Sequence, residues 1–269
     1  MPTAPDEPSA RGSGLRGATV VVTGAGRGIG AALARRFAEQ GARVAVNDRH
    51  PDRAEAVAAQ IGGIALPGEA SDAALVPTAL RRLGGTVDIY CANAGVAPSG
   101  GPELPDEQWD TAWSVNVMAH VRAARALLPH WLERGRGRFV CMASAAALTT
   151  MVGAAPYAVS KHAALAFAEW LSVSYRHRGI DVHAVCPRGV RTAMRRSAEA
   201  TRNMMLTSVP IGADEVAGAI LAGIADGRFL ILPHPEAAEH AAARADDRER
   251  WLRDINRLQQ QREAGQQAG

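Results

Sequence analysis

Lysine is nearly absent from this sequence of 269 residues: 29 of its 30 basic residues are arginine, and Lys161 is the exception. No run of about 18 uninterrupted apolar residues occurs, which excludes a membrane-spanning helix. Aromatic residues make up only 4% of the chain, while glycine and alanine are abundant. This composition suits helices packed closely on a sheet.

Cysteine and metal-ligand patterns are also sparse. The three cysteines, Cys91, Cys141 and Cys186, lie apart in apolar runs, so we expect no disulfide framework and a reducing compartment. No CxxC pair or His/Cys cluster suggests a metal. The net charge of +3 forms no basic patch, which argues against a nucleic-acid partner. Residues 1–14 lack the apolar core of a signal peptide, so we expect a disordered tail and a cytoplasmic protein.

Short apolar runs alternate with longer helical patterns along the chain. The runs are continuously apolar, as expected for strands buried on both faces of a sheet. Strands are predicted at 18–24, 42–48, 63–68, 87–95, 137–144, 180–187 and 228–233. Helices are predicted at 29–40, 51–61, 72–83, 106–133, 156–177 and 213–226. The alternation predicts an α/β fold: one Rossmann-like domain over 15–235, with a doubly wound parallel sheet of about seven strands in three αβα layers.

A C-terminal helical extension follows over 236–269. Residues 236–263 read as one charged helix with an apolar stripe of Trp251, Leu252, Ile255 and Leu258. Such a stripe needs a partner, which is either the helix's own domain or a second subunit.

The first predicted strand leads directly into "TGAGRGIG" and a helix. Glycine is needed where the backbone turns tightly or where a phosphate approaches it, and a helix N-terminus offers N–H groups to an anion. We therefore predict that this turn accepts the pyrophosphate of a dinucleotide and that its residues Gly24, Arg27, Gly28, Ile29 and Gly30 bind the cofactor. A merely structural turn is the alternative.

Asp48 ends the second predicted strand, about 20 residues beyond the glycines, where a dinucleotide fold places the acid that accepts from the adenosine ribose. A carboxylate there repels the extra phosphate of NADP and favours NAD. Arg49 and Arg27 are the residues that would pair with that phosphate instead. A simple loop carboxylate is the third reading of Asp48.

Together with two later motifs, the glycine turn gives the chain a family resemblance over residues 15–235. TGxxxGxG is followed by "NAG" at the end of the fourth predicted strand and then by YxxxK, in an order that resembles the short-chain dehydrogenase/reductase family in its shorter, single-domain branch. The motif residues are Thr23, Gly24, Gly28 and Gly30, then Asn93, Ala94 and Gly95, then Tyr157 and Lys161. The resemblance implies four catalytic residues: Asn116, Ser144, Tyr157 and Lys161.

The chemistry of the YxxxK pair can be stated without the family. A tyrosine exchanges a proton near neutral pH only if its pKa falls from about 10 towards 7, a change worth roughly 4 kcal/mol. A cation ~4 Å away supplies about that much at an effective dielectric constant of about 20. Because Tyr157 and Lys161 stand four residues apart on a predicted helix, both side chains lie on one face.

The resemblance implies further roles. Lys161 holds the nicotinamide ribose, Ser144 binds the substrate oxygen, and Asn116 anchors a water that relays protons. Glu69 and Ala70 contact adenine. Asn93, Ala94 and Gly95 lie beneath the cofactor, and Pro187, Val190 and Thr192 lie at its nicotinamide end. Each of these residues also has a plain structural reading, as a strand-end hydroxyl, a helix amide or a core-edge tyrosine.

The sequence departs from the family pattern at several positions. Ala92 replaces the first asparagine of the usual NNAG motif, and Glu69 stands where an aspartate is usual. Arg188 takes the place of a glycine after the sixth predicted strand. An arginine there either points to solvent or contacts an acidic group of the substrate. The C-terminus lacks a glycine-rich ending, so a dimer is as well supported as a tetramer, with the helices at 106–133 and 156–177 pairing.

The resulting hypothesis is an oxidoreductase that transfers hydride between NAD(H) and a secondary alcohol or ketone. Met194, Met204, Met205 and Leu206 suggest an apolar flap and hence a largely apolar substrate; packing of the flap onto the core is the alternative. The rival functions are an NADP-dependent carbonyl reductase and a non-catalytic, dinucleotide-sensing regulatory protein. We expect a homo-oligomer without membrane, nucleic-acid or metal partners.

Overall fold

The computed structural model describes residues 14–192 and 209–267, with side chains undescribed at 262 and 265–267. The predicted tail, apart from Gly14, and the four residues of the predicted flap therefore lie outside the described residues. Seven parallel strands form one sheet in the order β3-β2-β1-β4-β5-β6-β7. They are β1 (Thr19–Val22), β2 (Arg43–Asp48), β3 (Ile64–Pro67), β4 (Ile89–Ala92), β5 (Gly137–Met142), β6 (Ile180–Val185) and β7 (Leu230–Ile231). The predicted doubly wound sheet is confirmed.

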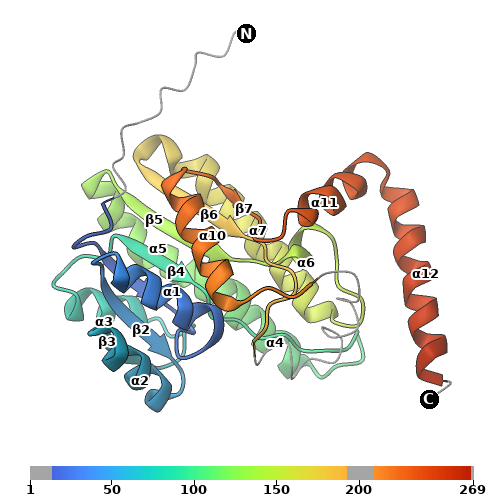
Figure 1. Ribbon diagram of the computed structural model, residues 1–269, viewed down its shortest axis with the longest axis horizontal. Helices are drawn as coiled ribbons and strands as arrows, with labels where there is room; N and C mark the ends of the chain where they lie inside the picture. The colour runs from blue at the N-terminus through green and yellow to red at the C-terminus, as the bar shows by residue number, and fades with distance from the viewer. Residues whose placement is uncertain (1–13, 193–208, 268–269) are drawn as a thin grey trace, which may run out of the picture.

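Helices cover both faces of this sheet (Figure 1). One apolar core packs α3 (Leu75–Arg82), α5 (Ala119–Arg134) and α7 (Ala155–Tyr175) on one face. A second core packs α1 (Gly28–Glu39), α2 (Pro51–Ile61) and α10 (Ala213–Ala225) on the other. Alternate residues of one strand serve the two cores: Val20 and Val22 face the second, and Val21 faces the first. This division explains why the strands read as continuous apolar runs.

The predicted helix 106–133 is divided. It comprises α4 (Asp106–Trp113), a π-helical turn η1 (Ser114–Met118) and α5, which continues through Pro129. Asn116 lies at the centre of the π turn, where one extra residue per turn changes which backbone groups pair. The short helix α6 (Ala145–Leu148) and the 3₁₀ turn η2 (Arg176–Arg178) were not predicted.

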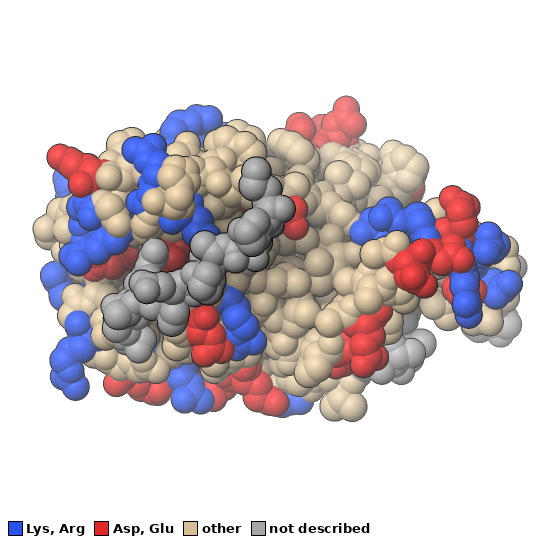
Figure 2. All heavy atoms as spheres, turned by 90° about the horizontal axis from the view of Figure 1, so that it is seen from above, with Lys and Arg blue, Asp and Glu red and all other residues tan. Residues whose placement is uncertain are grey.

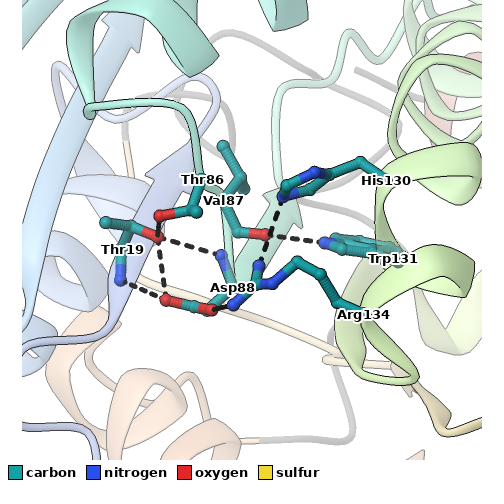
Figure 3. A network of polar contacts seen from close by, with 7 residues as sticks. All are labelled: Thr19, Thr86, Val87, Asp88, His130, Trp131 and Arg134. Atoms are coloured by element: carbon teal, nitrogen blue, oxygen red, sulfur yellow. Dashed lines mark hydrogen bonds and ion pairs between the residues drawn. The ribbon is translucent and has the colours of Figure 1, made fainter.

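A polar network around Asp88 fixes the sheet edge opposite the carboxyl ends of the strands (Figure 3). The Asp88 carboxylate accepts from the backbone N–H and the hydroxyl of Thr19, both at 2.9 Å, and from Arg134 at 2.6 Å. Trp131 donates its indole N–H to the carbonyl of Val87 at 2.6 Å. Burial raises the pKa of Asp88, but the hydrogen bonds from Thr19 and Arg134 outweigh it, so the pKa lies below its usual value. The network attaches α5 to the starts of β1 and β4.

The C-terminal extension differs from the single predicted helix. It forms α11 (Glu236–Asp246) and α12 (Arg248–Gln267), separated at Asp247, whose extended backbone (φ −137°, ψ 91°) cannot continue a helix. Figure 1 shows α12 standing away from the body. Trp251 packs under Arg244 with 5.5 Å between the guanidinium carbon and the ring centroid, whereas Leu252 and Leu258 are 49% and 57% exposed. The two leucines of the predicted stripe therefore do not pack on their own domain.

Charged side chains are unevenly distributed over the surface. In Figure 2 the C-terminal arm carries clustered charges of both signs, while the surface between the arm and the body is largely uncharged. No helix within the described ranges is long and apolar enough to cross a membrane. The three cysteines are free and buried, with Cys91 in β4, Cys141 in β5 and Cys186 one residue beyond β6.

Candidate active site

The glycine turn joins β1 to α1 and leaves no room for side chains. Gly24 and Gly28 have φ angles of 60° and 57°, which favour glycine. A Cβ on Gly30 would lie 2.4 Å from the carbonyl oxygen of Gly24. No side chain caps the N-terminus of α1, and its first turn contains no acidic residue. The first N–H groups of α1 are therefore available to an anion, and this cradle fits the pyrophosphate of a dinucleotide.

Thr23 fastens the glycine turn to the segment after β4. Its hydroxyl accepts from the backbone N–H groups of Asn93 and Ala94, at 2.9 and 3.0 Å, and donates to the carbonyl of Cys91 at 3.2 Å. The Asn93 amide in turn donates to the carbonyl of Thr23 at 2.8 Å. Two motifs 70 residues apart in the chain thus form one rigid floor.

Asp48 is held in place at the other side of the turn. It is 7% exposed, and its two carboxylate oxygens accept from the backbone N–H groups of Gly26 and His50, at 3.1 and 3.0 Å. Several basic side chains line the same end of the cavity: Arg27, Arg49, His50 and Arg53. This end therefore contains both a fixed carboxylate, which favours NAD, and the cations that would favour NADP.

Asn47 shapes the loop after β3. Its amide donates to the carbonyls of Leu66 and Gly68, at 2.9 and 2.8 Å, which fixes the strand end that leads to Glu69 and Ala70. Both of those residues line the cavity. Asn47 also lines it, and its buried amide oxygen has no partner among the described residues.

Ser144, Tyr157 and Lys161 lie on the other half of the cavity wall. Ser144 follows β5 and begins α6, where its hydroxyl accepts from the backbone N–H of Ala146 at 3.1 Å. Tyr157 and Lys161 stand one turn apart on α7. Lys161 is 3% exposed and donates to the carbonyl of Met142 at 2.6 Å.

In the chain without cofactor, the pKa of Tyr157 differs from the value expected from the sequence. Burial raises the pKa of Tyr157, and contact with the Ser144 hydroxyl offsets only part of that rise. The Lys161 ammonium lies 5.9 Å from the centroid of the Tyr157 ring and donates to β5 instead. Burial also lowers the pKa of Lys161 to about 8. The expected depression of the tyrosine pKa by this lysine is therefore not present in this geometry.

Asn116 is fully buried and lies behind the cavity wall. Its amide oxygen accepts from the Val96 N–H, and its amide nitrogen donates to the Val96 carbonyl and to the Ser160 hydroxyl, all at 2.9 Å. A Cβ on Gly95 would lie 3.2 Å from the Asn116 amide oxygen and 3.5 Å from the Lys161 ammonium. The side chain is thus occupied in a clamp, in which only the second lone pair of its amide oxygen stays unused.

The segment after β6 closes the nicotinamide end. The Pro187 carbonyl accepts from the N–H of Ala145 at 2.9 Å, next to Ser144. Thr192 approaches the glycine turn, because a Cβ on Gly28 would lie 3.3 Å from its methyl group. The side chain of Arg188 is only 15% exposed, so the expectation that it points to solvent is wrong.

The cavity has a volume of about 460 Å³ and brings together nearly all of the predicted site residues. Gly28 and Asn116 are the two that do not line it. The lining residues not predicted to bind are Asn47, His50, Arg53, Val96, Ala97, Thr111, Ser114, Val115, Met142, Ala143, Met151 and Arg188. Thr111, Ser114 and Val115 stand at positions i, i+3 and i+4, so they share one helical face, and this spacing is the signal in the sequence that could have found them.

Comparisons with known proteins agree with this geometry. Residues 18–203 match the family model described as short chain dehydrogenase. The chain is 38% identical to a 1-deoxy-11-beta-hydroxypentalenate dehydrogenase of Streptomyces avermitilis, over 83% of this chain and 87% of that protein. Its fold matches a short-chain dehydrogenase/reductase of Burkholderia phymatum in complex with NAD, with a TM-score of 0.78, 28% identity and coverage of 88% and 95%. A short-chain dehydrogenase of Sphingobium yanoikuyae in complex with NADPH matches with a TM-score of 0.75, 27% identity and coverage of 88% and 95%.

Proposed function

The chain belongs to the short-chain dehydrogenase/reductase family of NAD(P)-dependent oxidoreductases, and from that premise we propose that it transfers hydride between NAD(H) and a secondary alcohol or ketone. One observation carries the proposal. Ser144, Tyr157 and Lys161 line one half of a cavity whose other half is formed by the glycine turn and Asp48. A proton donor and a dinucleotide cradle therefore share one space.

The chain holds the cofactor through several of its own groups. The first N–H groups of α1 bind pyrophosphate, Asp48 accepts from the adenosine ribose, and Glu69 and Ala70 contact adenine. At the other end Lys161 donates to the nicotinamide ribose, and Val190 and Thr192 hold the carboxamide. The bound cofactor supplies hydride for reduction or accepts it for oxidation, and its oxidised ring carries a positive charge.

Tyr157 performs the proton step. In reduction its phenol donates a proton to the substrate oxygen, and in oxidation its phenolate removes the proton of the alcohol. The raised pKa of Tyr157 in the chain alone keeps the phenol protonated at neutral pH, which suits the acid role. The Ser144 hydroxyl donates to the same substrate oxygen and stabilises its developing charge. Oxidation requires the pKa of Tyr157 to fall, and the positive charges of Lys161 and of the oxidised cofactor ring favour that fall.

We assign Asn116 a positioning role. Its two-way hydrogen bonding with Val96 fixes the loop after β4 against α7 through Ser160. The π turn gives the neighbouring backbone carbonyls a different pairing from that of a regular helix, and the Asn116 carbonyl is the group we assign to a relay water.

We favour NAD because Asp48 is fixed by two backbone N–H groups and cannot turn away from a 2′-phosphate. An NADP-dependent carbonyl reductase is the second candidate, supported by Arg27, Arg49 and Arg53 at the same end of the cavity. Affinities for NADH and NADPH, measured by fluorescence, separate the two. Asp48→Asn removes the repulsion, so it should shift the preference towards NADPH by about tenfold or more.

The substrate half of the cavity favours an apolar molecule. Val96, Ala97, Val115 and Met151 line it beside Tyr157. The curated relative from Streptomyces avermitilis is named for a hydroxypentalenate, which is compatible with such a pocket. Exposed apolar side chains on α4 and α7, namely Trp113, Trp170 and Val173, support a homo-oligomer of this proposed cytoplasmic enzyme.

A screen of secondary alcohols and ketones with NAD(H) and NADP(H), read by nicotinamide absorbance, tests the function. Tyr157→Phe should reduce turnover at least about 100-fold while cofactor affinity stays within threefold. Tyr175→Phe is the matched control, because this second tyrosine of α7 packs on Trp170 outside the cavity. Near-normal turnover by Tyr157→Phe would remove the assigned proton donor.

A further inference from the structure

Arg188 is held at its backbone, together with the carbonyl of Gly189, by the ring of His234. Its N–H donates to the Nδ1 atom of His234 at 3.2 Å, and the Nε2 atom of His234 lies 3.2 Å from the carbonyl oxygen of Gly189. Since Nδ1 accepts, Nε2 carries the hydrogen and donates, so His234 is the neutral tautomer. His234 is 2% exposed and burial lowers its pKa, which keeps this form at neutral pH. The Arg188 backbone is thereby held one residue from Pro187, whose carbonyl is bonded to Ala145.

The Arg188 side chain is only 15% exposed, but its guanidinium has no close anionic partner. Its Nη1 atom lies 3.2 Å from His240 and 3.9 Å from a carboxylate oxygen of Glu236, both on α11. The first partner is neutral or cationic, and the second lies at the outer limit of an ion pair. The Nε and Nη2 atoms have no partner among the described residues. A largely buried arginine ordinarily has a close anionic partner, so this one retains capacity for another anion.

The cofactor is not that anion. Arg188 follows β6, whereas the pyrophosphate cradle follows β1, and β4 and β5 lie between them in the sheet. Three strand spacings separate the two positions by roughly 14 Å. The acids that line the cavity, Asp48 and Glu69, follow β2 and β3, which lie still further away. Among the described lining residues, the substrate half has no acid, and its cations are Lys161 and Arg188.

We propose that Arg188 determines substrate specificity by binding a carboxylate, so that the enzyme prefers apolar ketones or alcohols that carry one acidic group. A guanidinium presents parallel N–H donors that match the two oxygens of a carboxylate, which a neutral ester cannot replace. His234 and α11 position this cation, and the apolar wall of Val96 and Met151 receives the rest of the molecule. The inference rests on the proposed alcohol–ketone chemistry and names the substrate class of that site.

The test compares acids with their own esters. The probes are 4-oxocyclohexanecarboxylate and 3-oxocyclopentanecarboxylate, each assayed beside its methyl ester with the preferred cofactor. The wild-type kcat/KM for the acid should exceed that for the ester by about 10- to 100-fold, the range given by hydrogen bonds to a charged group. Arg188→Gln should abolish this difference, lowering kcat/KM for the acid by that factor while the value for the ester stays within threefold. Arg188→Lys should restore part of the difference.

Glu236→Gln is the matched control for the role of Arg188 in holding α11. It removes the competing carboxylate but keeps the guanidinium, so the acid-to-ester ratio should stay equal or rise. If Arg188→Gln lowered kcat/KM equally for acid and ester, Arg188 would only hold α11 in place, and the proposed carboxylate site would be wrong. An acid used no better than its ester by the wild-type enzyme, or not used at all while neutral ketones are, would overturn the inference and leave the proposed function intact. Failure of every alcohol and ketone would instead remove the proposed function.

Discussion

The ammonium nitrogen of Lys161 lies 2.6 Å from the carbonyl oxygen of Met142, so the single lysine donates to β5 and not to Tyr157. The contact places a compact cation in a space that is 3% exposed, directly under Gly95. A planar guanidinium is larger and directs its N–H groups differently. The choice of lysine in a chain that otherwise uses arginine therefore has a steric reason at this position.

Lys161→Arg tests that reason. If charge alone mattered, the variant would keep most of its activity. We expect kcat/KM to fall at least about 100-fold, because the larger guanidinium cannot occupy the space between Met142 and Gly95. Lys161→Met serves as the comparison without charge and should lose about as much. An arginine variant within threefold of wild type would contradict the steric argument.

The buried lysine also predicts a pH dependence of stability in the protein without cofactor. Its pKa is about 8 in the folded chain and about 10.4 when unfolded. Between these values the unfolded chain binds the proton and the folded chain does not, so stability rises with pH. From pH 8 to 10, the unfolding free energy of the wild type should therefore rise relative to that of Lys161→Met. Parallel curves for the two proteins would show that the lysine pKa is not depressed.

Thr23→Val tests the fastening between the glycine turn and the segment after β4. The variant leaves the half-buried N–H group of Ala94 without an acceptor, at a cost of about 1–3 kcal/mol, whereas the Asn93 N–H keeps the carbonyl of Cys91 at 2.9 Å. We expect a lower urea midpoint and a Kd for NADH raised about tenfold or more. Thr23→Ser keeps the hydroxyl and should lie close to wild type in both measurements. Equal effects of the two substitutions would point to packing and not to the hydrogen bonds.

Asp88→Asn tests the network at the opposite sheet edge. The substitution removes the ion pair with Arg134 and should cost about 1–3 kcal/mol of unfolding free energy at pH 7. Because the pKa of Asp88 is depressed in the folded chain, its contribution is complete above about pH 4 and is lost as the pH falls further. The difference between wild type and variant should therefore shrink in acid.

The matched control for Asp88→Asn is Asp226→Asn, which removes an exposed ion pair. Asp226 pairs with Arg228 at 2.8 Å, but the two side chains are 58% and 52% exposed, so the loss should be below about 1 kcal/mol. Neither substitution should change cofactor affinity, since both residues lie outside the cavity. A raised Kd for NADH in Asp88→Asn would show coupling between the two edges of the sheet.

The sheet and the glycine turn that lines the cavity were predictable because their signals are local. Continuous apolar runs identified all seven strands, and the glycines after β1 marked the turn where any side chain would collide with the backbone. Asp48 and Ser144 follow strand ends, and parallel strands bring their carboxyl ends to one edge. These residues line one cavity for that topological reason.

The remaining features depend on contacts between distant segments. Asn116 in the π turn bonds to Val96, 20 residues earlier, and the Arg188 side chain contacts α11, some 50 residues later in the chain. The rise in the pKa of Tyr157 comes from burial, which spacing alone does not reveal. The break at Asp247, by contrast, has a local signal that the single predicted helix overlooked, because aspartate is a preferred N-cap residue and the Asp247 carboxylate accepts from the N–H of Arg250 at 2.8 Å.

The solitary lysine gives this protein an unusual chemical handle. Its side chain is the one primary amine among all the side chains of the sequence, and it lies at the centre of the cavity wall. Reductive methylation or an acylating reagent, followed by intact-mass measurement, would therefore report on Lys161 by one mass shift beyond the adduct of the chain's α-amino group. A ligand that fills the cavity would register as protection of that single mass shift, whatever the ligand's own spectrum.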